Sequence, residues 1–338
     1  MSVKEEVLSK LEQHRGEDIS GEALARELGV SRAAVWKAIN VLKEQGYKIE
    51  SSTNRGYRLS EHSDILSAEG IKLHLSGDAA LADVIVFDEI DSTNLEAKRM
   101  AANGAQNAAI IVADSQTVGR GRFGRVFYSP EGCGIYMSIL LKPTAEQVSE
   151  AVMLTTAAAV AVCRAAAKLS DLSPGIKWVN DIYVNDRKVC GILSEAVFDI
   201  ESGSIGSVVI GIGINFKQST EPMPQDIANI AGSFFGENAP VSRNQFTAQV
   251  ANELFLMLSK LSEREFLKEY RERSILIGKE IVYSRGNEKY AAIAEDIDQD
   301  GALVVRYEDG KVEALKSGEV SVRAKANQAS LPFPAGNA

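Results

Sequence analysis

The apolar side chains of residues 1–63 recur at helical spacing in three successive segments and then at strand spacing in two. Ser31 stands directly before the third segment, where its hydroxyl can cap the first turn of a helix. Gly29 supplies the preceding turn and Gly46 ends the third helix. Helices are expected around 7–11, at 21–28 and at 32–45, and strands at 47–49 and 56–59. This order is that of a winged helix-turn-helix.

The third helix is the element that would enter a DNA major groove, so its outward side should be polar. Residues 1–64 contain ten Lys and Arg against eleven Asp and Glu, so positive charge has to be concentrated on one face. A small helical domain that binds protein is the alternative. The candidate DNA-binding residues are Ser31, Arg32, Lys37 and Asn40 on the helix and Asn54, Arg55 and Arg58 near the tip of the strand pair.

From about residue 81 the pattern changes to apolar strands with a few helices between them. Strands are expected at 84–87, 108–113, 135–141, 176–178, 182–184, 188–198 and 207–214, and helices at 94–103, at 150–169 and as a pair within 245–270. Short turns between several strands favour antiparallel pairing, so this part is an α+β domain. The apolar run 151–167 is interrupted by Arg164, which favours a buried core helix over a membrane span.

The last part of the chain predicts a small β-barrel. Five short strands are expected at 280–283, 290–297, 302–307, 312–315 and 320–323. Turn signals separate them at Asp300-Gly301 and Asp309-Gly310. The expected division of this multidomain chain is a winged helix-turn-helix at 1–63, a linker with a short helix at 64–80, a central domain at 81–274, the barrel at 275–324 and a disordered tail at 325–338.

Composition and charge narrow the class of protein. A chain of 338 residues is too long for one ordinary core, and 45% hydrophobic with 25% charged residues is typical of a folded protein. The formal net charge of -9 excludes a protein coated in basic charge but not a local DNA-binding surface. The cysteines Cys133, Cys163 and Cys190 form no CxxC pair, and no apolar leader opens the chain, so we expect reduced thiols and a cytoplasmic location.

The Gly- and Arg-rich segment 119–125, which reads GRGRFGR, is the first candidate for chemistry. Its glycines let the backbone approach a ligand closely, and its arginines are forked donors for carboxylate and phosphate. Ordering such a loop is costly without an anion. The segment therefore favours a small anionic ligand over a merely mobile basic loop or an RNA-binding tract.

A second stretch, 177–184, reads KWVNDIYV and is followed by Lys188 and Gly191. Asn180 and Asp181 lie between two expected strands, where a carboxylate can meet Mg²⁺ or a substrate amine. Lys188 can neutralise an acyl or phosphate oxygen. Alone, an Asn-Asp pair in a hairpin is usually only a turn. Together with the arginine-rich segment 119–125, the pair favours a functional site.

A third stretch, GIGIN at 211–215, places glycines in an expected strand, which suggests close approach of a ligand or a neighbouring backbone. The chain has neither a GxGxxG fingerprint nor a GxxxxGK[ST] loop, so any ATP would not be held in the Walker manner.

Together with Asp91–Asn94 and Gln116, these stretches resemble the bifunctional biotin–protein ligases that also repress the biotin operon. The resemblance runs in order through nearly the whole chain. It implies a central domain similar to class II aminoacyl-tRNA synthetases and a C-terminal SH3-like barrel. Phe127 stands where the family often has Trp against adenine, and Val179 where it often has Pro. Compared with Trp, Phe keeps an aromatic face but offers less area for contact with adenine.

The resemblance implies two half-reactions and a regulatory role. Biotin and Mg-ATP give biotinyl-5'-adenylate and pyrophosphate. The biotinyl group then passes to one lysine of a biotin carboxyl carrier protein, a subunit of acetyl-CoA or pyruvate carboxylase. The adenylate-bound form would be a homodimer, with strand 188–198 as its expected edge, that represses biotin genes by binding operator DNA through two winged helices.

The resemblance also assigns roles to individual residues. Biotin would contact Ser92, Thr93, Asn94, Gln116, Gly119, Arg120, Gly121, Lys188 and Gly191. ATP and the adenylate would contact Arg122, Arg125, Phe127, Asn180 and Asn215. The catalytic residues would be Arg122, Asp181 and Lys188, with Asp181 also the candidate Mg²⁺ ligand.

Three alternatives stay open. A ligase for a related cofactor such as lipoate would have a similar fold, although a long apolar chain does not need the polar set of Ser92, Thr93 and Gln116. A regulator that senses biotin without ligase activity is disfavoured by the presence of Arg122 and Lys188. The nearly neutral charge of residues 1–64 keeps open a ligase whose helix-turn-helix no longer binds DNA.

Overall fold

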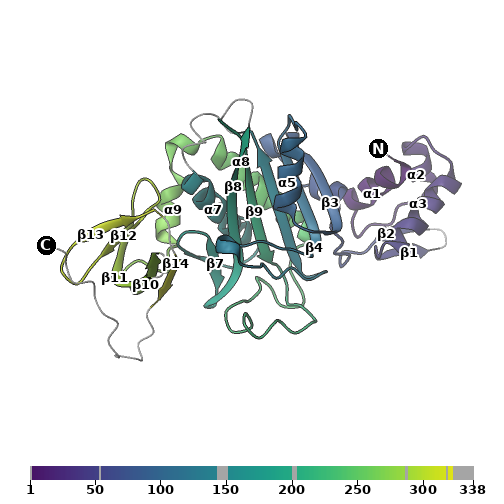
Figure 1. Ribbon diagram of the computed structural model, residues 1–338. Helices are drawn as coiled ribbons and strands as arrows, with labels where there is room; N and C mark the ends of the chain where they lie inside the picture. Colours follow the sequence, from purple (N-terminus) through teal and green to yellow (C-terminus); the bar gives the residue numbers. More distant parts are fainter. Residues whose placement is uncertain are drawn as a thin grey trace.

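The computed structural model describes residues 2–52, 55–142, 151–199, 204–285, 288–316 and 319–322. The described chain forms three parts that follow one another in space as they do in sequence (Figure 1). A helical module lies at one end, a large sheet with helices lies in the middle, and a small sheet of C-terminal strands lies at the other end.

The N-terminal module has the predicted winged helix-turn-helix order. Ser2, Ser20 and Ser31 each cap a helix by accepting a backbone N–H with the hydroxyl. The apolar sides of the helices meet in a separate core that contains Leu24 and Leu42. The elements are α1 (Val3–Gln13), α2 (Gly21–Glu27), α3 (Arg32–Glu44) and the antiparallel strands β1 (Ile49–Ser52) and β2 (Gly56–Leu59).

The central sheet has seven strands in the order β3-β4-β5-β9-β8-β7-β6, and β3 and β4 are its one parallel pair. This mixed and mostly antiparallel sheet confirms the predicted α+β fold. Its strands are β3 (Asp83–Ile90), β4 (Ala109–Gln116), β5 (Gly134–Leu141), β6 (Gly175–Lys177), β7 (Asp181–Val184), β8 (Arg187–Asp199) and β9 (Ser204–Asn215).

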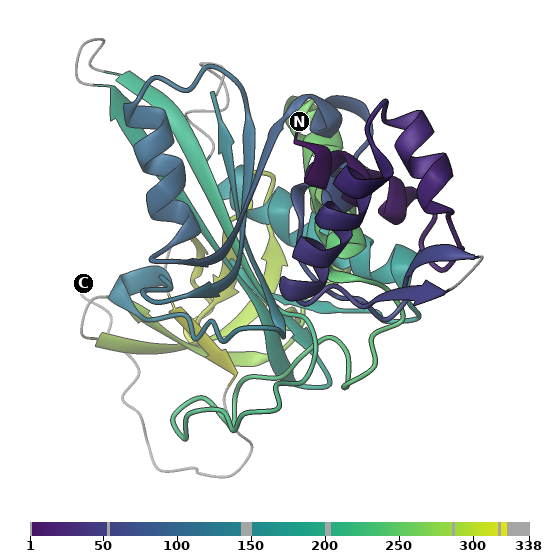
Figure 2. The ribbon, with the colours of Figure 1, turned by 90° about the vertical axis from the view of Figure 1, so that its right-hand side faces the viewer.

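Helices cover both faces of this sheet (Figure 2). Along β4, Ala109 and Ile111 pack on the face of α5, whereas Ile110 and Val112 pack on the face of α7 and α8. Of the described helices, α7 is the one apolar enough to cross a membrane, but 67% of its window Val152–Leu169 is buried inside the protein, as predicted for a core helix. The helices are α4 (Ala68–Lys72), α5 (Thr93–Ala102), α7 (Ala151–Leu169), α8 (Arg243–Leu258) and α9 (Phe266–Glu272), with 3₁₀ turns at Gly77–Leu81 and Leu261–Glu263.

Five C-terminal strands form an antiparallel sheet in the order β13-β12-β11-β10-β14. The sequence predicts a barrel, but among the described residues no pairing joins the outer strands β13 and β14, so barrel closure is not detected. Trp178 Nε1 donates to Gly301 O over 2.9 Å and joins this sheet to the central part. The tail predicted at 325–338 lies outside the described residues. The strands are β10 (Glu280–Arg285), β11 (Glu288–Ile297), β12 (Leu303–Arg306), β13 (Val312–Leu315) and β14 (Glu319–Val322).

Candidate active site

A cavity of about 390 Å³ lies where strands β5, β8 and β9 meet the Gly/Arg segment 119–125. Distant parts of the chain complete it, including the segment 217–242 after β9 and Val320 of β14. Of the residues predicted to bind biotin, ATP or adenylate, Gly119 is the exception that does not line it. The predicted residues that do line it are Ser92, Thr93, Asn94, Gln116, Arg120, Gly121, Arg122, Arg125, Phe127, Asn180, Asp181, Lys188, Gly191 and Asn215.

One wall of the cavity is backed by a connected set of hydrogen bonds between buried side chains. Asn94 Nδ2 donates to Glu195 Oε2 over 2.8 Å, which turns Asn94 Oδ1 toward Ser138 Oγ, 2.6 Å away. The single Ser138 proton therefore goes to Asn94, because an amide oxygen can only accept. Thr93 Oγ1 lies 2.7 Å from Ser138 Oγ and 3.3 Å from Gln116 Oε1, so its single proton is used within this set. The lone pairs of Thr93 Oγ1 are thus left as acceptors at the cavity wall.

Gln116 is held in one orientation next to this set. Its Oε1 accepts the backbone N–H of Thr93 over 2.9 Å, and its Nε2 donates to Ser129 Oγ over 3.0 Å. A side chain that is oriented before a ligand arrives loses little conformational freedom on binding. This wall can therefore recognise a small polar group through directed hydrogen bonds.

The Gly/Arg segment folds back on itself beside the cavity. The Phe127 N–H donates to Gly119 O over 3.0 Å. A Cβ at Gly119 would lie 2.2 Å from Phe127 O, so this residue acts by permitting a close backbone approach and not by lining the cavity. Arg122, in the 3₁₀ turn Arg122–Gly124, donates from Nη1 to Asn180 Oδ1 over 3.1 Å. The segment is thereby tied to the turn between β6 and β7.

Cations dominate the cavity walls. The cationic lining residues are Arg120, Arg122, Arg125, Lys177 and Lys188. Asp181 is the one acidic residue among the described lining residues, so five cations against one carboxylate leave an excess of four. Lys188 Nζ lies 2.7 Å from Asp181 Oδ1, yet that oxygen accepts no hydrogen bond, so the ion pair is close but poorly directed. Such a cavity suits a polyanionic ligand.

A divalent cation fits this site only where the protein and a bound nucleotide hold it together. Within the described ranges, no three or more His, Cys, Asp and Glu side chains gather in a metal-binding group. Mg²⁺ is often held by one or two carboxylates together with substrate phosphates. Asp181 can supply that one carboxylate if a nucleotide supplies the phosphates.

Phe127 forms the aromatic side of the cavity. Its ring lies so close to β8 and β9 that a Cβ at Gly213 would come within 2.6 Å of it and a Cβ at Gly191 within 3.3 Å. A Cβ at Gly211 would lie 2.2 Å from Asn94 Oδ1. The strand glycines therefore make room for protein side chains of the site, where the sequence suggested a ligand or a neighbouring backbone.

Tyr183 and the thiol of Cys190, both in the cavity lining, are neutral near pH 7. Burial raises the pKa of Tyr183 to about 12, and the Asp181 carboxylate adds to the shift. Burial raises the pKa of the Cys190 thiol well above its usual value. Neither side chain is an anionic nucleophile at neutral pH, so the chemistry of the cavity depends on its cations and its hydrogen-bonding groups.

The sequence patterns do not single out Ser138, Glu195 or the segment 217–242, which support or line the cavity. Ser138 carries a usable signal, since it is a polar residue in the apolar strand 134–141 and is fully buried. Glu195 carries none, because its partner Asn94 lies 101 residues earlier in the chain.

The helix candidates for DNA binding lie on the outside of the N-terminal module. Arg32 and Lys37 are exposed on α3, and Asn40 is half-buried. The Ser31 hydroxyl caps the helix by accepting the N–H of Ala34, so its acceptor side already has a partner.

The strand pair contributes less than the sequence suggests. Arg55 is exposed, with its guanidinium 3.8 Å from the Asp18 carboxylate. Arg58 is hydrogen-bonded to Glu50 on the neighbouring strand, and Asn54 lies outside the described residues. Trp36 on α3, which is not among the DNA-binding residues predicted from the sequence, is 60% exposed and adds an aromatic surface beside Lys37.

Three protein families match successive parts of the chain. Residues 3–58 match a family described as HTH domain. Residues 86–215 match the Biotin/lipoate A/B protein ligase family, and residues 276–323 match the Biotin protein ligase C terminal domain.

The chain is similar to curated proteins and solved structures over most of its length. It is 31% identical to the bifunctional ligase/repressor BirA of Escherichia coli (strain K12), over 91% of this chain and 94% of that protein. It is 37% identical to the bifunctional ligase/repressor BirA of Bacillus subtilis (strain 168), over 69% of this chain and 70% of that protein. It is also similar to the structure of the biotin protein ligase from Aquifex aeolicus in complex with biotin and ATP, with a TM-score of 0.61 and 27% identity, over 71% of this chain and 98% of that one.

Proposed function

The chain belongs to the family of bifunctional biotin protein ligase/repressors, and from this premise we propose how its residues carry out both activities. It is a biotin–[acetyl-CoA-carboxylase] ligase with a helix-turn-helix DNA-binding module. The observation that carries the proposal is the cavity, where a wall of directed hydrogen-bonding groups faces an excess of positive charge. Such a site fits a small polar acid that reacts with a nucleotide polyphosphate.

The hydrogen-bonding wall binds the ring of biotin. Thr93 Oγ1 offers only lone pairs, so it accepts a ureido N–H, and Ser92 and Gln116 complete the polar contacts. Asn94 acts mainly by accepting a hydrogen bond from Ser138, and this set of bonds leaves Thr93 Oγ1 as an acceptor for the ligand. Gly121, Gly191 and Arg120 line the path of the side chain toward the reacting carboxylate.

The cationic wall brings two anions together. The biotin carboxylate oxygen attacks the α-phosphorus of ATP, the bond to the bridging oxygen breaks, and pyrophosphate leaves. Arg122 and Lys188 reduce the repulsion between the reactants and stabilise the charge on the transferring phosphoryl group. Mg²⁺, held by Asp181 and the phosphates, would neutralise further phosphate charge.

The adenylate is held between aromatic and polar groups. Phe127 packs over Gly213 and offers its ring to the adenine. Asn180, Asn215 and Arg125 line the same part of the cavity. The folded Gly/Arg segment excludes water from the activated acyl group, which slows its hydrolysis.

The second half-reaction transfers biotin to a lysine of a biotin carboxyl carrier protein. The lysine amine attacks the acyl carbon, AMP leaves, and the amine proton passes to solvent. Asp181, which lines the cavity beside Lys188, orients the incoming amine. The reaction takes place in the cytoplasm, where carrier protein and ATP are present.

Repression depends on two copies of the chain. Arg32, Lys37, Asn40 and Arg55, with Ser31 at the start of α3, contact operator DNA. Strand β8 pairs with β7 only as far as Gly191, so among the described residues its outer half has one unpaired edge. That edge would pair in the adenylate-bound homodimer, which places two winged helices on a palindromic operator.

The test of the enzyme is the mass of an acceptor. The chain is incubated with Mg-ATP and a carrier domain, together with either biotin or lipoate. We expect the carrier to gain one biotinyl group and no lipoyl group. A lipoyl gain would reassign the substrate, and no gain of either kind would contradict the ligase function. A mobility-shift assay with operator DNA, with and without biotin and ATP, tests repression, which predicts a shift that needs both.

A further inference from the structure

The segment 217–242, called here the cavity loop, forms one side of the ligase cavity although it lies between β9 and α8 and contains neither a helix nor a β-strand. Met223, Ile227 and Ile230 of this loop line the cavity. The loop starts shortly after Asn215 and ends directly before α8. It lies below the central sheet in both overall views (Figures 1 and 2).

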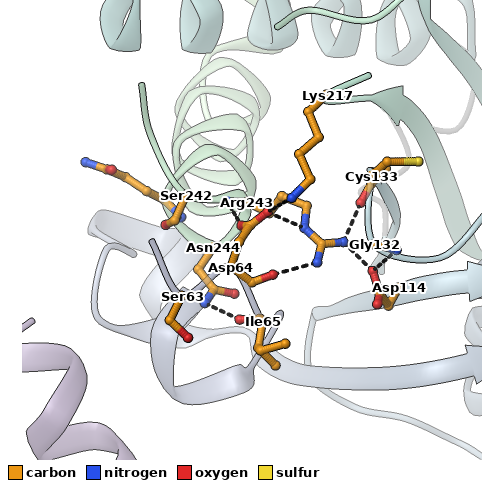
Figure 3. Close-up of polar contacts among 12 residues, drawn as sticks. Ser63, Asp64, Ile65, Asp114, Gly132, Cys133, Lys217, Ser242, Arg243 and Asn244 are labelled. Carbon is orange, nitrogen blue, oxygen red and sulfur yellow. Dashed lines mark hydrogen bonds and ion pairs between the residues drawn. The ribbon is translucent and has the colours of Figure 1, made fainter. Parts of the chain in front are cut away.

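Both ends of the cavity loop are bound to the same carboxylate, that of Asp64 (Figure 3). At its start, Lys217 Nζ donates to Asp64 Oδ2 over 2.7 Å. Directly after its end, Arg243 donates its backbone N–H to Asp64 Oδ1 over 3.1 Å and its Nε–H to Oδ2 over 3.2 Å. Asp64 belongs to the linker that follows the DNA-binding module and lies 179 residues before Arg243 in the chain.

Arg243 is the centre of this cluster and is only 2% exposed. Its guanidinium also donates to the backbone oxygens of Asp64 over 2.7 Å and Gly134 over 3.0 Å, and to the Asp114 carboxylate. Lys217 and Arg243 thus meet two carboxylates, so the charges of the four side chains cancel. Because Arg243 is buried, removal of a carboxylate that pairs with it leaves its charge partly uncompensated, which is unfavourable.

The cavity loop in turn holds the backbone of Lys188. The Lys188 N–H donates to Ile230 O over 2.8 Å, and Lys188 O accepts the N–H of Gly232 over 2.8 Å. Gly232 O also accepts from Asn215 Nδ2 over 2.9 Å. A shift of the loop therefore moves Lys188 and Asn215, which both line the cavity.

We propose that Asp64 is a positioning residue for the ligase reaction, because it fixes both ends of the cavity loop and through the loop the place of Lys188. This inference rests on the proposed function of the cavity. It makes a linker residue that does not line the cavity a determinant of biotin and adenylate affinity. Since the linker leads directly to the DNA-binding module, linker position and loop position are coupled, and a change in one alters the other.

The test uses Asp64→Asn and Lys217→Met in the full-length chain. Both substitutions keep the approximate size of the side chain and remove the charge that joins the linker to the loop. We expect the dissociation constant for biotin, measured by calorimetry without ATP, to rise roughly tenfold in each variant. The double variant should bind biotin no more weakly than Asp64→Asn alone, because Lys217 acts on the linker through its ion pair with Asp64. Release of preformed biotinyl-adenylate should accelerate by a similar factor.

Asn244→Ala is the matched control. Asn244 holds the same linker, with Oδ1 accepting the Ser67 N–H over 3.0 Å and Nδ2 donating to Ile65 O over 2.9 Å, through bonds that do not involve the cavity loop. Its biotin affinity should stay within about twofold of wild type. Wild-type affinity in both charge variants, or an equal loss in the control, would overturn the proposal. A wild-type chain that binds no biotin would overturn the proposed function and this inference with it, and is recognisable before any substitution is made.

Discussion

The ligase cavity and the DNA-binding module use their polar side chains in opposite ways. In the cavity, Ser138 donates to Asn94 and Gln116 is bonded to Thr93 and Ser129, so the geometry is set by one folded chain. On the module, Arg32 and Lys37 are exposed to solvent, and residues 1–64 contain ten basic and eleven acidic residues. The first arrangement can act in a single copy. The second gives weak, salt-sensitive DNA binding until two copies act together.

The largest expected effect of a single substitution falls on the cavity. Lys188→Met should lower the rate of adenylate formation by about 10²–10³-fold, because it removes a preorganised charge from the transferring group. DNA binding by the ligand-free chain should not change. Biotin-dependent exchange of pyrophosphate into ATP measures adenylate formation, and a mobility-shift assay measures DNA binding. Lys279→Met, at an exposed position outside the cavity, is the control and should retain full exchange. Equal loss in both variants would remove the special role of Lys188.

A smaller effect is expected one layer behind the cavity. Ser138→Ala leaves Asn94 Oδ1 without its donor and removes the Ser138 partner of the Thr93 hydroxyl, at a cost of about 1–3 kcal/mol. The dissociation constant for biotin should therefore rise about tenfold, while adenylation at saturating biotin changes little. Calorimetry and steady-state kinetics measure the two quantities. Ser207→Ala, a buried serine of the same sheet away from the cavity, should behave as wild type. Unchanged biotin affinity in Ser138→Ala would refute the assigned proton directions.

Much of this architecture could be predicted from local signals in the sequence. The Ser31 cap, the turn glycines and the alternating apolar positions place the helices and strands within a few residues of their observed ends. The chemistry of the Gly/Arg segment and of the pair Asn180-Asp181 predicts a place at the site, and both lie at the cavity. Short-range patterns suffice where the cause of a structure lies within a few residues.

The remaining features depend on contacts between distant residues. Asp64 is an ordinary acidic residue in a linker until the fold brings Arg243 to it across 179 positions. Gly213 could be recognised as a close contact, but not as the place where the Phe127 ring packs. The number and spacing of the C-terminal strands predict closure into a barrel. Closure depends on how β13 and β14 meet, and no pairing between them is detected in the described residues.

The smallest effect is expected on the DNA-binding module. Lys37→Ala should weaken operator binding a few-fold and reduce the slope of log affinity against log salt by about 1 for each copy that loses a phosphate contact. Ligase activity should be unaffected. Lys10→Ala is the control, since Lys10 lies on α1 and pairs with Glu27. Fluorescence anisotropy with labelled operator at several salt concentrations measures the slope. A ligase defect in Lys37→Ala would show that the two regions are less separate than their geometry indicates.

The most direct test of the account is the retention of the reaction intermediate by the cavity. The full-length chain is incubated with biotin and Mg-ATP, without an acceptor, and its mass is measured under native conditions. The proposed mechanism predicts one biotinyl-adenylate bound per chain, lost when a carrier domain is added and absent from Lys188→Met. A chain that binds biotin but retains no adenylate would contradict it.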